Sequence, residues 1–133
     1  MLAFFTSWRS IRRGQALVMF DAAALRNDGP LMPKDKELVA AYVSGLNACQ
    51  YCFGVHSQTA HAFGVPEEVL TRLLNDVDTA PVEEKLKPLL RYARKLTQEP
   101  SCMTKADAQA VLMLVAIRPR CMTPFRPSAF STL

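Results

Sequence analysis

The stretch Glu37-Leu-Val-Ala-Ala-Tyr-Val-Ser-Gly-Leu-Asn47-Ala-Cys49-Gln-Tyr-Cys52-Phe-Gly-Val-His56 decides how this chain is interpreted. Its spacing places the side chains of Cys49, Cys52 and His56 on one face if the segment is helical. Free backbone amides and the helix dipole favour a thiolate near the start of a helix. A histidine one turn beyond Cys52 can accept its proton or stabilise its anion. The pattern therefore favours thiol–disulfide chemistry.

Two alternatives compete with the redox interpretation of this motif. Cysteine is among the most buried residue types, so a helical C-x-x-C pair can simply belong to the core. A zinc site is the sharper alternative, with Cys49, Cys52 and His56 as three ligands. Structural zinc sites usually take further ligands from a second element, and the chain has no second C-x-x-C pair. His61 lies off the common face and is interpreted as a surface or hydrogen-bonded core residue, so we expect no metal and no other cofactor.

Helical periodicity dominates the rest of the chain, and strand signals are poor. We expect helices over about residues 10–26, 33–46, 47–63, 66–74, 79–96 and 104–114. The second of these has too many apolar positions for one stripe, which predicts a central, largely buried helix. The sequence is therefore that of an all-α protein with about six helices.

Several residues mark the expected helix ends. Asn47 can end the second helix and cap the third. Asn47 followed by Gln50 resembles a capping box, which would start the third helix at Asn47 and place Cys49 in its first turn. Gly64 suits the left-handed position after that helix. Pro88 predicts that the fifth helix either starts near it or is kinked there. A further cap-like signal, Thr104-Lys-Ala-Asp107, precedes the sixth helix.

Composition limits the function classes. The chain has 133 residues, half of them hydrophobic, which fits one globular domain with a real core. The net charge is +4, but the basic residues alternate with acids and no nucleic-acid motif is present. No segment approaches the ~20 apolar residues of a membrane span, and no signal peptide is recognisable. We therefore expect a cytoplasmic protein without nucleic-acid or membrane partners, in which Cys102 and Cys121 are ordinary residues.

An acidic residue followed by Asn-x-Cys-x-x-Cys-x-x-x-His resembles the alkyl hydroperoxidase D branch of the carboxymuconolactone decarboxylase family. The similarity is greatest to its peroxidase-related group. The resemblance covers about residues 31–111 and includes the Ala60 to Val65 stretch and Lys95-Leu-Thr97. The positions that match the motif are Glu37, Asn47, Cys49, Tyr51, Cys52, His56 and Ser57.

The resemblance implies an alkyl hydroperoxidase D-like helical bundle and a thiol-dependent peroxidase that reduces alkyl hydroperoxides. Cys52 would attack the peroxide, Cys49 would close the disulfide, and an external dithiol would reduce it. His56 and Glu37 would form the proton relay. Dipole reasoning alone favours Cys49 as the attacking thiol, whereas adjacency to His56 favours Cys52. The resemblance also implies a homo-oligomer.

Residues 113–133 depart from the family pattern, which usually continues with a glycine-containing turn and further helices. The Arg/Pro-rich segment contains three prolines within residues 118–127 and is expected to be irregular. A one-base shift would allow family-like codons here, so we hypothesise a frameshifted or mis-assigned reading frame, which gene sequencing would decide. We therefore expect a helical domain over residues 1–112 and an atypical tail over 113–133. A catalytically impaired helical oligomer that retains the motif is the rival interpretation.

Overall fold

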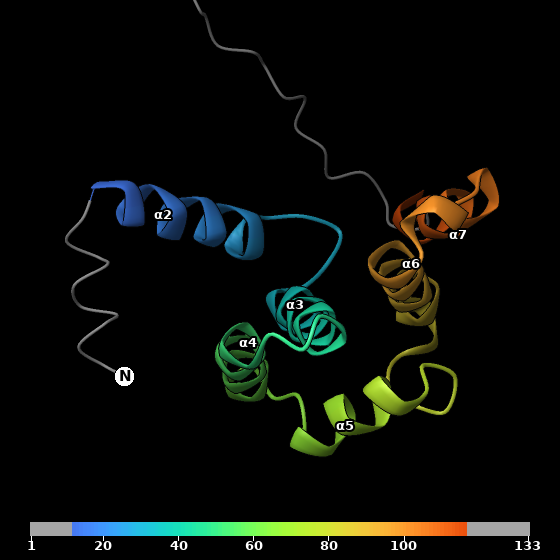
Figure 1. Ribbon diagram of the computed structural model, residues 1–133, viewed down its shortest axis with the longest axis horizontal. Helices are drawn as coiled ribbons and strands as arrows, with labels where there is room; N and C mark the ends of the chain where they lie inside the picture. Colours follow the sequence, from blue (N-terminus) through green and yellow to red (C-terminus); the bar gives the residue numbers. More distant parts are fainter. Residues whose placement is uncertain (1–11, 117–133) are drawn as a thin grey trace, which may run out of the picture.

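A computed structural model describes residues 12–116, with side chains from Gly14 to Met113. Within this range the chain is all-α and has no strand, as predicted (Figure 1). The α-helices are α2 (Arg12–Arg26), α3 (Pro33–Leu46), α4 (Gln50–Ala62), α5 (Glu67–Asn75), α6 (Lys87–Gln98) and α7 (Lys105–Ala116). Two short 3₁₀ helices, η1 (Glu84–Leu86) and η2 (Pro100–Cys102), flank α6. The expectation of about six helices is confirmed.

The helix α3 is central to the fold. It packs against α4, α5 and α6 and contacts α2, and Figure 1 shows it in the middle of the arrangement. Its residues Leu38, Ala41 and Tyr42 are buried. The surrounding helices and loops complete the core with Ala60, Val65, Val69, Leu70, Leu73, Val77, Ala80, Leu86 and Leu90. The sequence predicted a central helix, and this is confirmed. Because α3 has neighbouring helices on several sides, it needs apolar residues on more than one face.

Three residues, 47–49, connect α3 to α4. The N–H of Ala48 donates to Gly45 O and the N–H of Cys49 donates to Ser44 O, both at 3.0 Å. Ala48 itself has a φ of 53°, in the left-handed region. This is the hydrogen-bond pattern of a Schellman motif, which closes the C-terminus of α3 with backbone groups alone. It also fixes the backbone of Cys49 against the end of α3.

The capping box predicted at Asn47 is wrong. Asn47 is the C-terminal cap of α3, and α4 begins at Gln50 with Cys49 as its N-cap residue. The reason is that the C-terminal carbonyls of α3 take up the backbone amides at 47–49. Cys49 therefore precedes the first turn of α4 instead of lying within it.

The predicted end of α4 and the prediction for Pro88 are both confirmed. Gly64 has a φ of 91° and its N–H donates to His61 O at 2.8 Å, so it occupies the left-handed position that follows the helix. Pro88 lies in the first turn of α6, where its missing N–H costs nothing. The fifth predicted helix therefore begins later than residue 79, after the short 3₁₀ helix η1.

The N-terminus of α7 carries the predicted cap. The N–H of Thr104 donates to Asp107 Oδ2 at 2.8 Å, and the Thr104 hydroxyl donates to the same oxygen at 2.7 Å. Lys95 from α6 adds an ion pair to Asp107 at 2.7 Å. The helix runs to Ala116, four residues past the expected domain end at residue 112. Residues 117–133 of the proposed tail, including Cys121, lie outside the described range.

None of the helices in the described part of the chain combines the length and the apolar character that crossing a membrane requires.

Candidate active site

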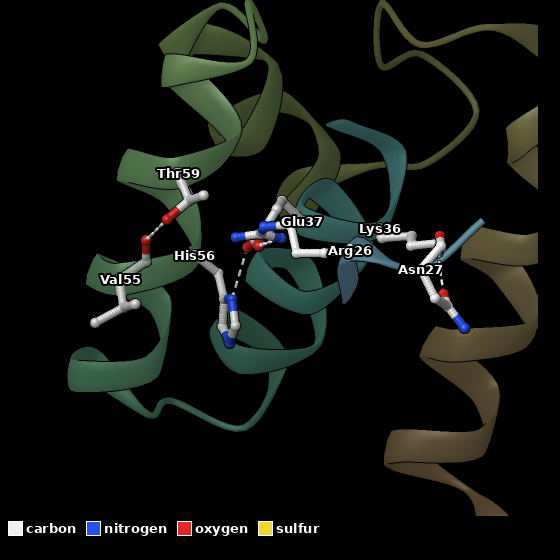
Figure 2. Close-up of polar contacts among 7 residues, drawn as sticks. All are labelled: Arg26, Asn27, Lys36, Glu37, Val55, His56 and Thr59. Atoms are coloured by element: carbon white, nitrogen blue, oxygen red, sulfur yellow. Dashed lines mark hydrogen bonds and ion pairs between the residues drawn. The ribbon is translucent and has the colours of Figure 1, made fainter. Parts of the chain in front are cut away.

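A carboxylate and an imidazole from the two central helices meet at the middle of the site. His56 Nδ1 on α4 lies 2.8 Å from Glu37 Oε2 on α3, and Figure 2 shows the two side chains pointing toward each other. Because an ionised carboxylate only accepts hydrogen bonds, Nδ1 carries the hydrogen. The other ring nitrogen, Nε2, is then the basic one when His56 is neutral. The structure thus brings together Glu37 and His56, two of the predicted site residues.

Glu37 is almost fully buried, with 1% of its side chain exposed. Its second oxygen, Oε1, forms an ion pair with the NH1 group of Arg26, the last residue of α2. The Arg26 guanidinium also lies 5.3 Å from the ring centroid of Phe63, at the end of α4. Burying a carboxylate is costly unless it is paired and hydrogen-bonded, and here both oxygens have partners.

Arg26 was not anticipated from the sequence. It lies eleven residues before Glu37 and is separated from it by the break after α2, so no helical spacing links the two residues. The one available signal was a basic residue at the C-terminus of the first predicted helix, and such residues usually interact with the helix dipole.

Cys49 and Cys52 are both free thiols and both partly buried. The pKa of Cys49 is lowered, first by a hydrogen bond from the Cys52 side chain and then by the backbone amides of Cys52 and Tyr51. The pKa of Cys52 is raised by that same hydrogen bond, by burial and by the negative charge on Cys49. In the reduced pair the negative charge is therefore favoured on Cys49 and the proton on Cys52. The structure agrees with the dipole reasoning on this point.

His56 follows Cys52 by four residues within α4, so the two side chains leave the helix on the same side. Among the described residues, no hydrogen bond joins His56 to either cysteine. Nε2 of His56 nevertheless remains available on the side opposite the Glu37 contact. His61 does not join the site, since its Nδ1 interacts with Val65 O at 3.1 Å instead.

An open pocket of about 300 Å³ adjoins Cys49. Its walls are mostly apolar and come from the end of α3, the start of α4 and one side chain of α5. The lining residues are Ser44, Gly45, Ala48, Cys49, Gln50, Phe53 and Leu74. Gly45 keeps this region tightly packed, because a Cβ there would come within 2.8 Å of Leu74 Cδ2. Spacing along the sequence gave no sign of this pocket, because it forms only where three helices converge.

Metal binding would require several ligands to converge on one point. Within residues 12–116, no three or more His, Cys, Asp or Glu side chains converge as they would around a metal ion. Nδ1 of His56 contacts Glu37 Oε2 and is therefore not available as a metal ligand.

The fold and the site define a class of all-α protein in which a helical hairpin carries a C-x-x-C dithiol and a buried carboxylate paired with an imidazole. The family model described as the carboxymuconolactone decarboxylase family matches residues 14–95. The chain belongs to this family, which includes the alkyl hydroperoxidase D-like proteins and contains decarboxylases and peroxidase-related enzymes. The match covers most of α2, all of α3 to α5 and most of α6, and so includes every residue of the site. No match to the chain is found among curated proteins.

Proposed function

We propose that this protein is a thiol-dependent peroxidase that reduces organic hydroperoxides through a Cys49–Cys52 dithiol and disulfide cycle. One observation carries the proposal: the buried Glu37 and its partner His56 lie on the same helical hairpin as two interacting free thiols. A decarboxylase has no evident use for a dithiol, whereas a dithiol peroxidase uses one thiol to attack the peroxide and the other to resolve the sulfenic acid.

The first step of the proposed cycle is removal of the Cys52 proton by His56. Because the pKa of Cys52 is raised, this thiol needs a base to remove its proton. His56, one helical turn away, is that base. The Cys52 thiolate attacks the terminal peroxide oxygen, the O–O bond breaks, and Cys52 becomes a sulfenic acid. The departing alkoxide takes the proton from His56 and leaves as an alcohol. Glu37 holds the imidazole in the orientation that this transfer requires.

The second step uses the lowered pKa of Cys49. As a thiolate, Cys49 attacks the sulfur of the Cys52 sulfenic acid, and the disulfide forms as hydroxide leaves and is protonated to water. An external dithiol then reduces this disulfide and restores the two thiols by thiol–disulfide exchange. Two electrons pass in each cycle from the external dithiol to the peroxide.

The apolar pocket is lined by Cys49 and not by Cys52 or His56, and it supports an organic rather than an inorganic peroxide as substrate through its position next to the dithiol. Its walls include Phe53 and Leu74, and a volume of about 300 Å³ exceeds what hydrogen peroxide needs. Burial of an alkyl or aryl group there would contribute binding free energy of roughly 25 cal/mol per Å² of apolar surface. The expectations of a homo-oligomer and of a cytoplasmic location remain parts of this proposal.

The test is consumption of cumene hydroperoxide by the reduced protein with dithiothreitol as the reductant. We expect turnover by the parent protein and by Cys102→Ser, a matched control because Cys102 is an exposed cysteine outside the motif. Cys52→Ser should fall to the rate without enzyme. Equal rates for the parent and Cys52→Ser would refute the proposal.

The order of attack is tested with the single-cysteine variants and a sulfenic acid trap such as dimedone. After one equivalent of peroxide, Cys49→Ser should carry the trap on Cys52, because the resolving thiol is missing. Cys52→Ser should carry none on Cys49. Trapping on Cys49 alone would reverse the order of the two cysteines while leaving the dithiol cycle in place.

A further inference from the structure

Arg26 connects α2 to the carboxylate that orients the candidate base. Its NH1 group pairs with Glu37 Oε1, while His56 Nδ1 binds the other oxygen, Oε2, at 2.8 Å. Figure 2 shows Arg26, Glu37 and His56 as neighbours contributed by three different helices. The Phe63 ring, 5.3 Å from the guanidinium carbon, flanks Arg26 at the end of α4. One side chain therefore contacts both helices of the hairpin.

The charge of Arg26 is what distinguishes this contact from ordinary packing. Glu37 is 1% exposed, so water cannot compensate its negative charge. His56 can balance that charge only while it is protonated, and the proposed cycle requires it to lose and regain its proton. A guanidinium stays charged throughout. Arg26 is therefore the one permanent counter-ion that contacts Glu37 within the described residues.

The division of the two carboxylate oxygens also fixes geometry. With Oε1 engaged by Arg26, the carboxylate cannot rotate freely, and Oε2 is presented to Nδ1 of His56. The ring then keeps its hydrogen on Nδ1 and its lone pair on Nε2. This is the tautomer that can accept a proton on the side away from Glu37.

We propose that Arg26 is a positioning residue of this site, which balances the charge of the Glu37 carboxylate and orients it so that His56 is held in the Nε2-basic tautomer. The proposal rests on the peroxidase function proposed above, in which His56 acts as the base. Arg26 itself touches neither the thiols nor the substrate.

The kinetic test measures single-turnover oxidation of the reduced dithiol by cumene hydroperoxide, followed by thiol quenching and mass spectrometry. We expect Arg26→Ala and Arg26→Gln to react about 10- to 100-fold more slowly, the size expected when a catalytic group is misplaced. Arg26→Lys should keep most of the rate because it keeps the charge. Arg91→Ala is the matched control, since Arg91 forms an exposed ion pair with Asp78 away from the site.

Chemical rescue separates a positioning role from a purely structural one. Arg26 is 41% exposed, so a small cation can reach the space left by its side chain. Millimolar guanidinium chloride, far below denaturing concentrations, should restore a several-fold higher rate to Arg26→Ala. The same concentration of sodium chloride should not, and neither salt should change Arg91→Ala. Rates of Arg26→Ala and Arg26→Gln equal to that of the parent would overturn the proposal.

A spectroscopic readout tests Arg26 even if the protein proves inactive toward peroxides. The chain has two histidines, so the ring nitrogen-15 signals of His56 can be assigned with His61→Gln. The parent should show hydrogen on Nδ1, and Arg26→Gln should shift the ring toward the Nε2–H tautomer. An unchanged His56 tautomer in Arg26→Gln would refute the positioning role. An inactive parent with a shifted tautomer would refute the peroxidase proposal alone.

Discussion

His56 Nδ1 and Glu37 Oε2 lie 2.8 Å apart, although the two residues are nineteen positions apart in the sequence. The hairpin turn at 47–49 makes this possible because it folds α4 back along α3. The carboxylate is buried, and its other oxygen is paired with Arg26. The pair is therefore a fixed feature of the interior and differs from a surface ion pair, whose partners are usually mobile.

Replacement of Glu37 by glutamine should disable the base while nearly preserving side-chain volume. The amide carries no charge, so it no longer balances Arg26 or stabilises the imidazolium form of His56. We expect kcat/KM for cumene hydroperoxide to fall by about 10²- to 10⁴-fold, the range for loss of a general acid–base contribution. Glu83→Gln is a matched control, because Glu83 is 48% exposed and lies outside the site. Retention of parental kcat/KM by Glu37→Gln would exclude the relay.

Cys49 should be alkylated faster than Cys52 in the reduced protein at neutral pH. Its pKa is lowered and that of Cys52 is raised, so Cys49 has the larger thiolate fraction below the ordinary thiol pKa. The larger thiolate fraction of Cys49 outweighs the smaller intrinsic nucleophilicity of a low-pKa thiol. Peptide mapping after brief iodoacetamide treatment, repeated over pH, gives both rates.

The variant Cys52→Ala removes the main cause of the low Cys49 pKa, the hydrogen bond from the Cys52 side chain. The midpoint of the pH profile for Cys49 alkylation should therefore move upward in this variant. Equal alkylation rates for Cys49 and Cys52 in the parent, or an unmoved midpoint in Cys52→Ala, would contradict the charge distribution described above.

Ala48→Gly should stabilise the protein. Ala48 has a φ of 53°, where a side chain is strained and glycine is not. Glycine relieves this strain but has more conformational freedom to lose on folding, which offsets part of the gain. The net effect should raise the free energy of unfolding by about 0.5–1 kcal/mol. Urea denaturation measures the change. Ala110→Gly, at an exposed position within α7, should have the opposite sign and cost about 1 kcal/mol.

Asp107→Asn should loosen the attachment of α7 to α6 in a pH-dependent manner. The pKa of Asp107 is lowered to about 2, first by its hydrogen bond with Lys95 and then by Thr104. A lowered pKa in the folded state adds stability above the unfolded value, and this stability disappears as the pH falls through the folded value. The melting temperature of Asp107→Asn should thus be below that of the parent at pH 7. The difference should shrink toward pH 2, and a difference that is constant over this range would contradict the assignment.

Local signals in the sequence predicted most helix ends. Gly64, Pro88 and the Thr104–Asp107 pair act through backbone geometry within a few residues, so their effects could be anticipated. Of the two roles predicted for Asn47, ending α3 is confirmed and capping α4 is wrong, because the local pattern does not decide between them. The choice depended on the carbonyls of Gly45 and Ser44, which were free to bind the amides of Ala48 and Cys49.

The sequence by itself determined the all-α class, the family and the common face of Cys52 and His56 on α4, because helical periodicity and motif spacing are properties of neighbouring residues. Tertiary structure alone decided that Glu37 reaches His56, that Arg26 pairs with the second oxygen of the buried Glu37, and that an apolar pocket opens beside Cys49. These contacts join different helices. Their distances depend on how the helices pack, and residue spacing along the chain does not contain that information.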